Sequence, residues 1–303
     1  MIDEDAIIRR AELIEEIGVL SGNFVEDSAR VERELTDEIL ENGYDSLLDH
    51  LRLCGNIPEI YGQNSSEEKL YSKYTDCLLA AAYRNIGLNS LVLQERAGHA
   101  DVEVFAEDYA FVADAKAFRL SRTAKNQKDF KVGEMDRWRH GKRFAMLVCP
   151  IYQLPSRTSA IYRQATTRNV CIFTYSHLAL LVRYAREVDE NGTKQLITRI
   201  FQSVEQMHPS DNAMNYWNTI NQEIYSFSND IRPLWLDEKR ASEQSIEVGK
   251  EESLAYLALE RERIARLSRE EAVAQLLAAS RIDSKIQTIN RVTNNTQLFD
   301  NGN

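Results

Sequence analysis

The hydrophobic positions of this 303-residue chain change their spacing along its length. Near the start, apolar residues recur every three or four positions among glutamates and arginines, which is typical of an amphipathic helix. These positions are Ile7, Ile8, Ala11, Ile14 and Ile17. We expect a second helix over residues 27–40. The capping-box sequence Ser65-Ser-Glu-Glu68 predicts a third helix, which ends near Gly87.

The middle of the chain contains short runs rich in valine and aromatic residues, which predict β-strands. They lie at residues 91–93, 101–105, 109–116, 144–148 and 170–174. Helices are expected between and after the last strands, at residues 158–168 and 176–186. This order predicts a parallel crossover added to an antiparallel hairpin. The expected fold class is therefore α/β, with a mixed β-sheet flanked by helices.

Helical spacing returns after about residue 194, and it predicts a long charged helix over residues 237–266. Ser268-Arg-Glu-Glu271 marks another helix start, and the asparagine-rich end is expected to fray. The chain contains no internal repeat and no Gly/Ser linker. We therefore expect one domain with helical extensions rather than two independent domains. We expect an N-terminal extension, a core, a helical C-terminal part of the same domain and a flexible tail. Their expected ranges are 1–60, 61–190, 191–290 and 291–303.

The composition indicates a soluble cytoplasmic protein. Hydrophobic residues make up 43% of the chain, enough for a sizeable core, yet no apolar run is long enough to cross a bilayer. The acidic N-terminus lacks the pattern of a signal peptide. The four cysteines are scattered, so buried thiols are expected, and the five histidines form no zinc-binding pattern.

The charge distribution points to a polyanionic partner, although the net charge is −10. Between Lys116 and Arg143 there are ten basic residues against three acidic ones, a local charge of +7. The remainder therefore carries −17. A basic patch on an acidic body attracts a polyanion to one face. The alternative is a solvated charged helix, but the acids that usually accompany such a helix are largely missing here.

Asp101, Asp114 and Lys116 are the candidate catalytic residues. If Glu107 and Asp108 form a two-residue turn, Asp101 faces Asp114 across an antiparallel pair, with Cβ atoms about 4.5–5.5 Å apart. Two opposed carboxylates suit Mg²⁺ or Mn²⁺, and Lys116 points to the same face as Asp114. This set is the minimum for metal-assisted phosphodiester hydrolysis. A slip of the register by one residue would turn Asp101 away.

The segment from Arg119 to Lys131 is a candidate DNA-reading element, because basic residues alternate there with amide, hydroxyl and acid side chains. Lysine and arginine bind phosphates or guanine, asparagine and glutamine pair with adenine, and aspartate accepts from cytosine. The candidate DNA-binding residues are Arg119, Ser121, Arg122, Lys125, Asn126, Gln127, Lys128 and Asp129. A solvated helix is the alternative.

Several runs of residues resemble the HindIII family of type II restriction endonucleases. The strongest are Val112-Ala-Asp-Ala-Lys116 and the segment 118–132. Further matches occur at Ser65-Ser66, Glu68-Lys-Leu-Tyr-Ser-Lys73, Arg269-Glu-Glu-Ala272 and Ser284-Lys-Ile286, in the same order. The resemblance extends from about residue 54 to 290, which is far more specific than an acid-x-lysine pattern alone.

This resemblance implies a PD-(D/E)xK nuclease fold and a homodimer that cuts double-stranded DNA at AAGCTT. Cleavage after the first A would leave four-base 5′ overhangs. The metal positions would be Asp101, Asp114 and Ala115, binding Mg²⁺ with Mn²⁺ as a substitute, and Lys116 would be catalytic. A cognate DNA methyltransferase is expected in the same cell, without direct contact.

One acid upstream of the hairpin departs from the family pattern, which reads Leu-Glu-Gln-Arg where this chain has Leu93-Gln-Glu-Arg96. Glu95 is the candidate for that catalytic role, and a surface glutamate is the alternative. Glu68 is a weaker candidate for orienting a metal-bound water. Two other functions stay open: a sequence-specific DNA-binding protein without cleavage activity, and a helical scaffold whose basic patch binds an acidic protein.

Overall fold

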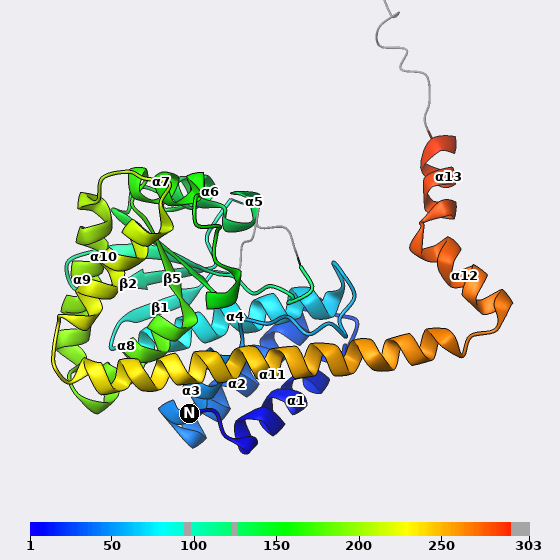
Figure 1. The fold of residues 1–303 in the computed structure, drawn as a ribbon, viewed down its shortest axis with the longest axis horizontal. Coiled ribbons are helices and arrows are strands. Elements are labelled where there is room, and N and C mark those ends of the chain that lie inside the picture. The colour runs from blue at the N-terminus through cyan, green and yellow to red at the C-terminus, as the bar shows by residue number, and fades with distance from the viewer. Residues whose placement is uncertain (94–97, 123–126, 292–303) are drawn as a thin grey trace, which may run out of the picture. The chain divides into compact units, whose positions relative to one another are not determined.

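The computed structural model describes residues 1–93, 98–122 and 127–291 (Figure 1). The chain divides into two compact units, Met1–Ser253 and Leu254–Asn303. The first unit contains the β-sheet and most helices. The second is helical where it is described, and we treat it separately. The domain boundaries expected at residues 60 and 190 stay predictions.

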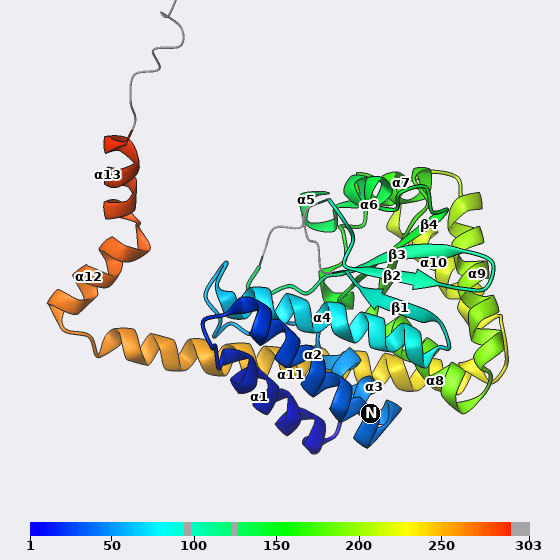
Figure 2. The same ribbon diagram turned by 180° about the vertical axis from the view of Figure 1, so that it is seen from behind.

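A five-stranded mixed sheet forms the centre of the first unit, with the strands in sequence order (Figures 1 and 2). Strands β1, β2 and β3 are antiparallel, whereas β3, β4 and β5 run parallel. Their bounds are Asn89–Val92, Val102–Phe105, Ala110–Ala115, Phe144–Cys149 and Val170–Thr174. The predicted hairpin with an added parallel crossover is therefore confirmed.

Helices cover the sheet. As a result, β4 and β5 are buried at every position, and β3 is buried from its second residue on. Helix α4 (Ser66–Asn85) packs against β1, β2 and β3. The helices α6 (Val132–Trp138) and α7 (Ala160–Thr167) pack against β5. Fully buried strands of this kind are expected where a parallel sheet is covered by helices.

Two helices that follow β5 complete the layer beside it. Helix α8 (Tyr175–Glu187) comes directly after the strand and packs back on it, and α9 (Glu190–Gln206) packs against both β5 and α8. Helix α10 (Ala213–Tyr225) then packs on α9. The short elements α5 (Gln127–Phe130) and η1 (Ile151–Gln153) lie between the larger ones.

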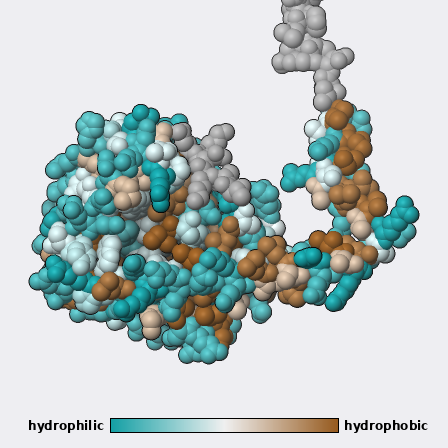
Figure 3. Space-filling model, viewed as in Figure 1, coloured by the Kyte–Doolittle hydropathy of each residue, from teal (hydrophilic) through white to brown (hydrophobic). Residues whose placement is uncertain are grey.

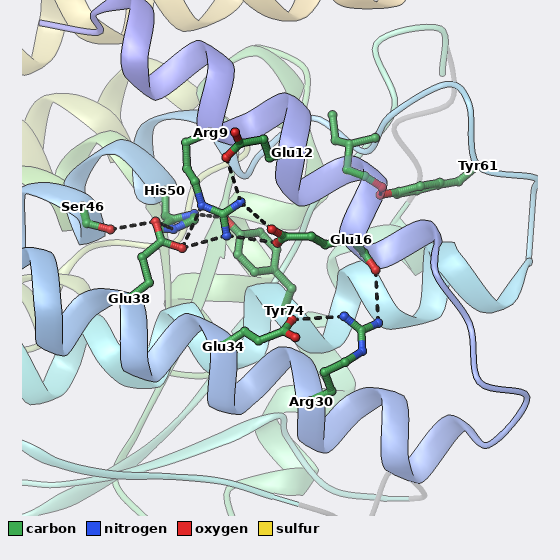
Figure 4. A network of polar contacts seen from close by, with 11 residues as sticks. Arg9, Glu12, Glu16, Arg30, Glu34, Glu38, Ser46, His50, Tyr61 and Tyr74 are labelled. Atoms are coloured by element: carbon green, nitrogen blue, oxygen red, sulfur yellow. Dashed lines mark hydrogen bonds and ion pairs between the residues drawn. The ribbon is translucent and has the colours of Figure 1, made fainter.

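Three N-terminal helices are joined by a network of polar contacts (Figure 4). They are α1 (Glu4–Gly18), α2 (Phe24–Asn42) and α3 (Tyr44–Leu53). Glu38 of α2 accepts hydrogen bonds from Arg9 of α1 and Ser46 of α3, and lies 3.0 Å from a ring nitrogen of His50. Burial would raise the pKa of Glu38, but the contacts with His50 and Arg9 outweigh it and lower the pKa to about 2. The network therefore holds Glu38 ionised.

The long helix α11 (Ile231–Ala265) begins six residues before the predicted start. Its buried residues share one side and stop at Ser253. Arg10 of α1 binds this helix through Glu252, with a shortest nitrogen–oxygen distance of 2.6 Å. The second unit continues with α12 (Arg269–Ala279) and α13 (Ile282–Asn290). The predicted cap of α12 is confirmed, since Ser268 and Glu271 form a complete capping box.

The four cysteines, Cys54, Cys77, Cys149 and Cys171, are buried free thiols as expected. Among the described residues, no helix is both long and apolar enough to span a membrane.

Candidate active site

The hairpin β2–β3 places Asp101 and Asp114 on neighbouring strands. Val102 pairs with Ala113, and the amide of Ala106 donates to the carbonyl of Tyr109 at 2.8 Å. The turn is therefore formed by residues 107 and 108, and the predicted register is confirmed. Extending this register by one position places Asp101 opposite Asp114. The side chains of directly opposed residues lie on the same face of the sheet.

Lys116 joins these two acids from the end of β3. Its ammonium contacts the carboxylate of Asp114, which is buried. The amide of Lys116 donates to the carbonyl of Val148 at 2.8 Å, so the neighbouring strand β4 fixes the backbone at this point. The structure thus brings together three of the four candidate catalytic residues.

The electrostatics of the two acids differ although they are neighbours. Burial and the charge of Asp114 raise the pKa of Asp101 well above its usual value. Burial also acts on Asp114, but the Lys116 ammonium and a hydrogen bond with Asp101 outweigh it and lower the pKa of Asp114. Opposite shifts are expected where two close carboxyl groups repel each other and a cationic side chain contacts one of them.

Asp76 of α4 is a third acid close to this pair, and sequence reasoning missed it. It is buried, and its Oδ2 lies 3.3 Å from the Nζ of Lys73. Burial raises the pKa of Asp76 to about 7; the charge of Lys73 opposes the rise and that of Asp114 adds to it. A clue was available, because Asp76 is the one acid within the run Tyr74-Thr-Asp-Cys-Leu-Leu-Ala-Ala-Ala-Tyr83.

These residues fit a hard divalent cation. Carboxylate oxygens are the ligands that Mg²⁺ prefers, and Oδ2 of Asp114 is buried without a hydrogen-bond partner apart from its contact with the Lys116 ammonium. In the described parts of the chain, no three His, Cys, Asp or Glu side chains converge closely enough to hold a metal. Two carboxylates and a backbone oxygen, for which Ala115 is the candidate, are therefore the available set.

Several candidate residues fall outside the described parts of the chain. Glu95, the upstream acid, is one of them, and so are Lys125 and Asn126 of the basic segment. Gln127 and Lys128 belong to α5, whose backbone is described, but their side chains are not. The roles of these residues stay predictions.

The other candidate DNA-binding residues contact protein groups. Arg119 donates to the carbonyls of Pro58, Tyr61 and Gly62, so it anchors the segment after Lys116 to a distant loop. Ser121 donates from its hydroxyl to Glu59 at 2.9 Å. Arg122 pairs with Asp129. These contacts fix the segment in place, and contacts with DNA stay a prediction.

A cavity of about 730 Å³ lies beside this segment. Its lining includes Glu59, Glu68, Arg119, Ser121 and Arg122. The Glu68 carboxylate lies 3.3 Å from Arg119. Glu68 therefore belongs to the wall beside the basic segment, whereas Asp76 from the same helix lies near the candidate catalytic acids.

Comparisons with known proteins identify the class. The family model described as HindIII restriction endonuclease matches residues 11–293. The chain is also 33% identical over 256 residues to the type II restriction enzyme HindIII of Haemophilus influenzae (strain ATCC 51907 / DSM 11121 / KW20 / Rd), a match that covers 80% of this chain and 82% of the relative. These matches show that the chain is a restriction endonuclease by class, a nuclease of restriction–modification systems. The chain belongs to the HindIII restriction endonuclease family, as its resemblance in sequence predicted.

Proposed function

We propose that this protein is a Mg²⁺-dependent type II restriction endonuclease of the PD-(D/E)xK superfamily. The observation that carries the proposal is the meeting of Asp101, Asp114 and Lys116 at the end of β3. Membership of the HindIII family supports the same activity. Mn²⁺ is expected to substitute, because oxygen ligands accept both ions.

In the proposed reaction, water attacks the scissile phosphorus in line and the products carry a 5′-phosphate and a 3′-hydroxyl. Asp101 and Asp114, with the carbonyl of Ala115, would hold the ion, which supplies positive charge for the developing phosphorane. Lys116 places its ammonium beside Asp114, where it neutralises charge on the phosphate and polarises the attacking water. Asp76 acts as a positioning residue, since it interacts electrostatically with both acids. Glu95 is proposed as the upstream catalytic acid of the same site.

The proposed substrate is double-stranded DNA with the palindrome AAGCTT, cut after the first A to leave 5′ overhangs. A homodimer fits a palindrome because each copy reads one half-site. The segment from Arg119 to Asp129 is proposed to read the bases, with Lys125, Asn126, Gln127 and Lys128 at its centre. A cognate methyltransferase in the same cytoplasm would protect the host DNA without touching this protein.

Digestion of a sequenced plasmid with Mg²⁺, followed by mapping of the ends, tests this proposal. We expect ends at AAGCTT with four-base 5′ overhangs, and no cleavage in EDTA. Plasmid DNA that is bound but never cut under any metal condition would favour the alternative of a DNA-binding protein without cleavage activity. If the ends mapped to another palindrome, the protein would still be a type II restriction endonuclease, but its recognition site would differ from AAGCTT.

A further inference from the structure

Arg10 of α1 is a buried charge that lies outside the candidate active site. Hydrophilic side chains cover most of the face of the first unit that Figure 3 shows. Arg10 is instead inside this unit, with only 5% of its surface exposed. An ionised side chain is costly to bury unless its donors are paired. The contacts of Arg10 therefore indicate what its burial achieves.

The guanidinium of Arg10 makes five hydrogen bonds, one for each of its N–H donors. Its Nε and one terminal nitrogen bind Glu252 of α11 at 2.6 and 3.0 Å. The other three bonds go to the carbonyl of Leu53 at 2.8 Å, the carbonyl of Asn56 at 2.9 Å and the hydroxyl of Tyr71 at 3.1 Å. Arg10 thus joins α1 and α11 to the end of α3 and to the loop that follows it.

Tyr71 of α4 binds the same loop. Its hydroxyl lies 2.9 Å from the carbonyl of Cys54 and 3.0 Å from that of Asn56, so it donates to one of the two at a time. The side chain of Tyr71 is fully buried. Arg10 and Tyr71 together hold the backbone of residues 53–57, which we call the clamp loop.

The clamp loop pairs with the chain just beyond Lys116. The amide of Phe118 donates to the carbonyl of Gly55 at 3.0 Å, and the amide of Ile57 donates to the carbonyl of Phe118 at 3.3 Å. These two bonds form an isolated parallel bridge. Because Phe118 comes two residues after Lys116, the bridge fixes the backbone where the proposed DNA-reading segment begins.

The bridge needs the support that Arg10 and Tyr71 supply. Two hydrogen bonds alone do not offset the conformational entropy that is lost when a loop is held in one place. The clamp loop is also packed tightly on its far end from Arg10, since a Cβ atom added to Gly55 would lie 2.7 Å from the side chain of Pro150. A loop confined in this way transmits the position of Arg10 to Phe118.

We propose that Arg10 is a positioning residue for DNA recognition, which fixes the clamp loop and, through it, the start of the DNA-reading segment. Tyr71 is its partner in this role. A displacement of about 1 Å at a group that meets the substrate costs about 100-fold in rate, so a remote contact that prevents it matters for recognition. This inference deepens the proposed function, on which it rests for the assignment of residues 119–129 to base reading.

The test uses the full chain with Arg10→Lys or Tyr71→Phe. Lysine keeps a positive charge beside Glu252 but lacks the planar fork that also reaches two carbonyls. Phenylalanine removes only the hydroxyl of Tyr71. Tyr162→Phe is the matched control, because the hydroxyl of Tyr162 is also part of a buried side chain, donates to a loop carbonyl, that of Pro155, and accepts one N–H bond.

Two readouts are measured for each variant. Hydrogen–deuterium exchange, followed by mass spectrometry of peptides, reports on the amides of Ile57 and Phe118. Fluorescence anisotropy in Ca²⁺ compares the affinity for a duplex containing AAGCTT with that for a duplex in which one base pair of the site is changed. In Arg10→Lys and Tyr71→Phe we expect faster exchange at both amides and about a tenfold loss of the discrimination that one base pair normally provides. Tyr162→Phe should lose a comparable amount of thermal stability and keep wild-type exchange and discrimination.

Unchanged discrimination in Tyr71→Phe would overturn the inference, even if exchange at Phe118 rises, because the contacts would then be structural alone. An equal loss of discrimination in Tyr162→Phe would overturn it too, since general destabilisation would explain both. If Arg10→Lys does not fold, Tyr71→Phe decides the test.

Failure of the proposed function gives a different result. A wild type that binds AAGCTT selectively but never cuts it in Mg²⁺ would contradict the nuclease assignment and leave the role of Arg10 intact. If the wild type cuts at another site, the discrimination is measured at that site, with the same outcomes for and against the inference.

Discussion

Asp101 and Asp114 face each other across the β2–β3 pair, and their pKa values shift in opposite directions, that of Asp101 upward through burial and that of Asp114 downward through the Lys116 ammonium. This relationship has a direct cause in the chain, because the two-residue turn at 107 and 108 sets the register that opposes them. It also has a chemical consequence. A divalent cation bound between the two carboxylates would relieve the repulsion between them.

The first prediction concerns thermal stability with and without metal. Asp101→Asn keeps a hydrogen-bond donor toward Asp114 but removes one ligand charge. We expect its melting temperature in EDTA to equal or slightly exceed that of the wild type. Added Mg²⁺ should raise the melting temperature of the wild type and leave the variant almost unchanged, since only a ligand that binds the folded state stabilises it. A Mg²⁺-dependent rise of equal size in both proteins would contradict the role of Asp101.

The second prediction concerns Lys116. Lys116→Ala should retain specific DNA binding and reduce the single-turnover cleavage rate by about 10²–10³-fold, the usual cost of one group that stabilises transition-state charge. Binding is measured in Ca²⁺ or EDTA by gel shift, and cleavage is measured in Mg²⁺. Lys194→Ala is the matched control, because Lys194 also pairs with an acid, Glu190, and lies outside the basic segment. Equal cleavage by Lys116→Ala and Lys194→Ala would refute the assignment.

Local patterns predicted the sheet and its central acids. Period-two runs rich in valine mark strands wherever the turn residues agree with them, and a two-residue turn leaves one register for the hairpin. The start of the long helix was harder to predict, since it was expected at residue 237 and lies six residues earlier. Proline is tolerated in the first turn of a helix, and α11 begins at Ile231 with Pro233 in that turn.

Long-range contacts could not be predicted in the same way. The approach of Asp76 to Asp114 depends on how α4 packs on β3, and no local pattern encodes the rotation of one element against another. Arg119 shows the same limit, since its guanidinium binds carbonyls about sixty residues earlier in the chain. The basic composition of the segment after β3 predicted contacts with DNA. It gave no sign that the Arg119 guanidinium donates to carbonyls of the loop at 58–62.

The third prediction separates the two acids of α4. Asp76→Asn should lower the cleavage rate by about 10–100-fold and weaken the dependence on Mg²⁺, as expected for a group that supports metal ligands. Glu68→Gln should leave the metal dependence unchanged, because Glu68 contacts Arg119 rather than the acid pair. The cleavage rate is measured against Mg²⁺ concentration for both variants. The same Mg²⁺ curve for Asp76→Asn and the wild type would exclude this positioning role.

The fourth prediction concerns His177, which is buried on α8 between Thr174 and Asn221. Burial lowers its pKa from 6.5 to about 4, although the contact with Asn221 opposes the shift. The unfolded chain therefore binds a proton below about pH 6.5 that the folded chain refuses until about pH 4. Stability should fall as the pH drops through this window, by about 2 kcal/mol between pH 7.5 and pH 5 for this group alone.

Urea unfolding at pH 7.5 and pH 5 measures this effect in the wild type and in His177→Gln, whose amide retains polar contacts without titrating. We expect the wild type to lose about 2 kcal/mol more than the variant on acidification. His208→Gln is the matched control, since His208 is exposed and its removal should leave the pH dependence as it is in the wild type. An unchanged pH dependence in His177→Gln would mean that the buried ring accepts its proton as readily in the folded chain as in the unfolded one.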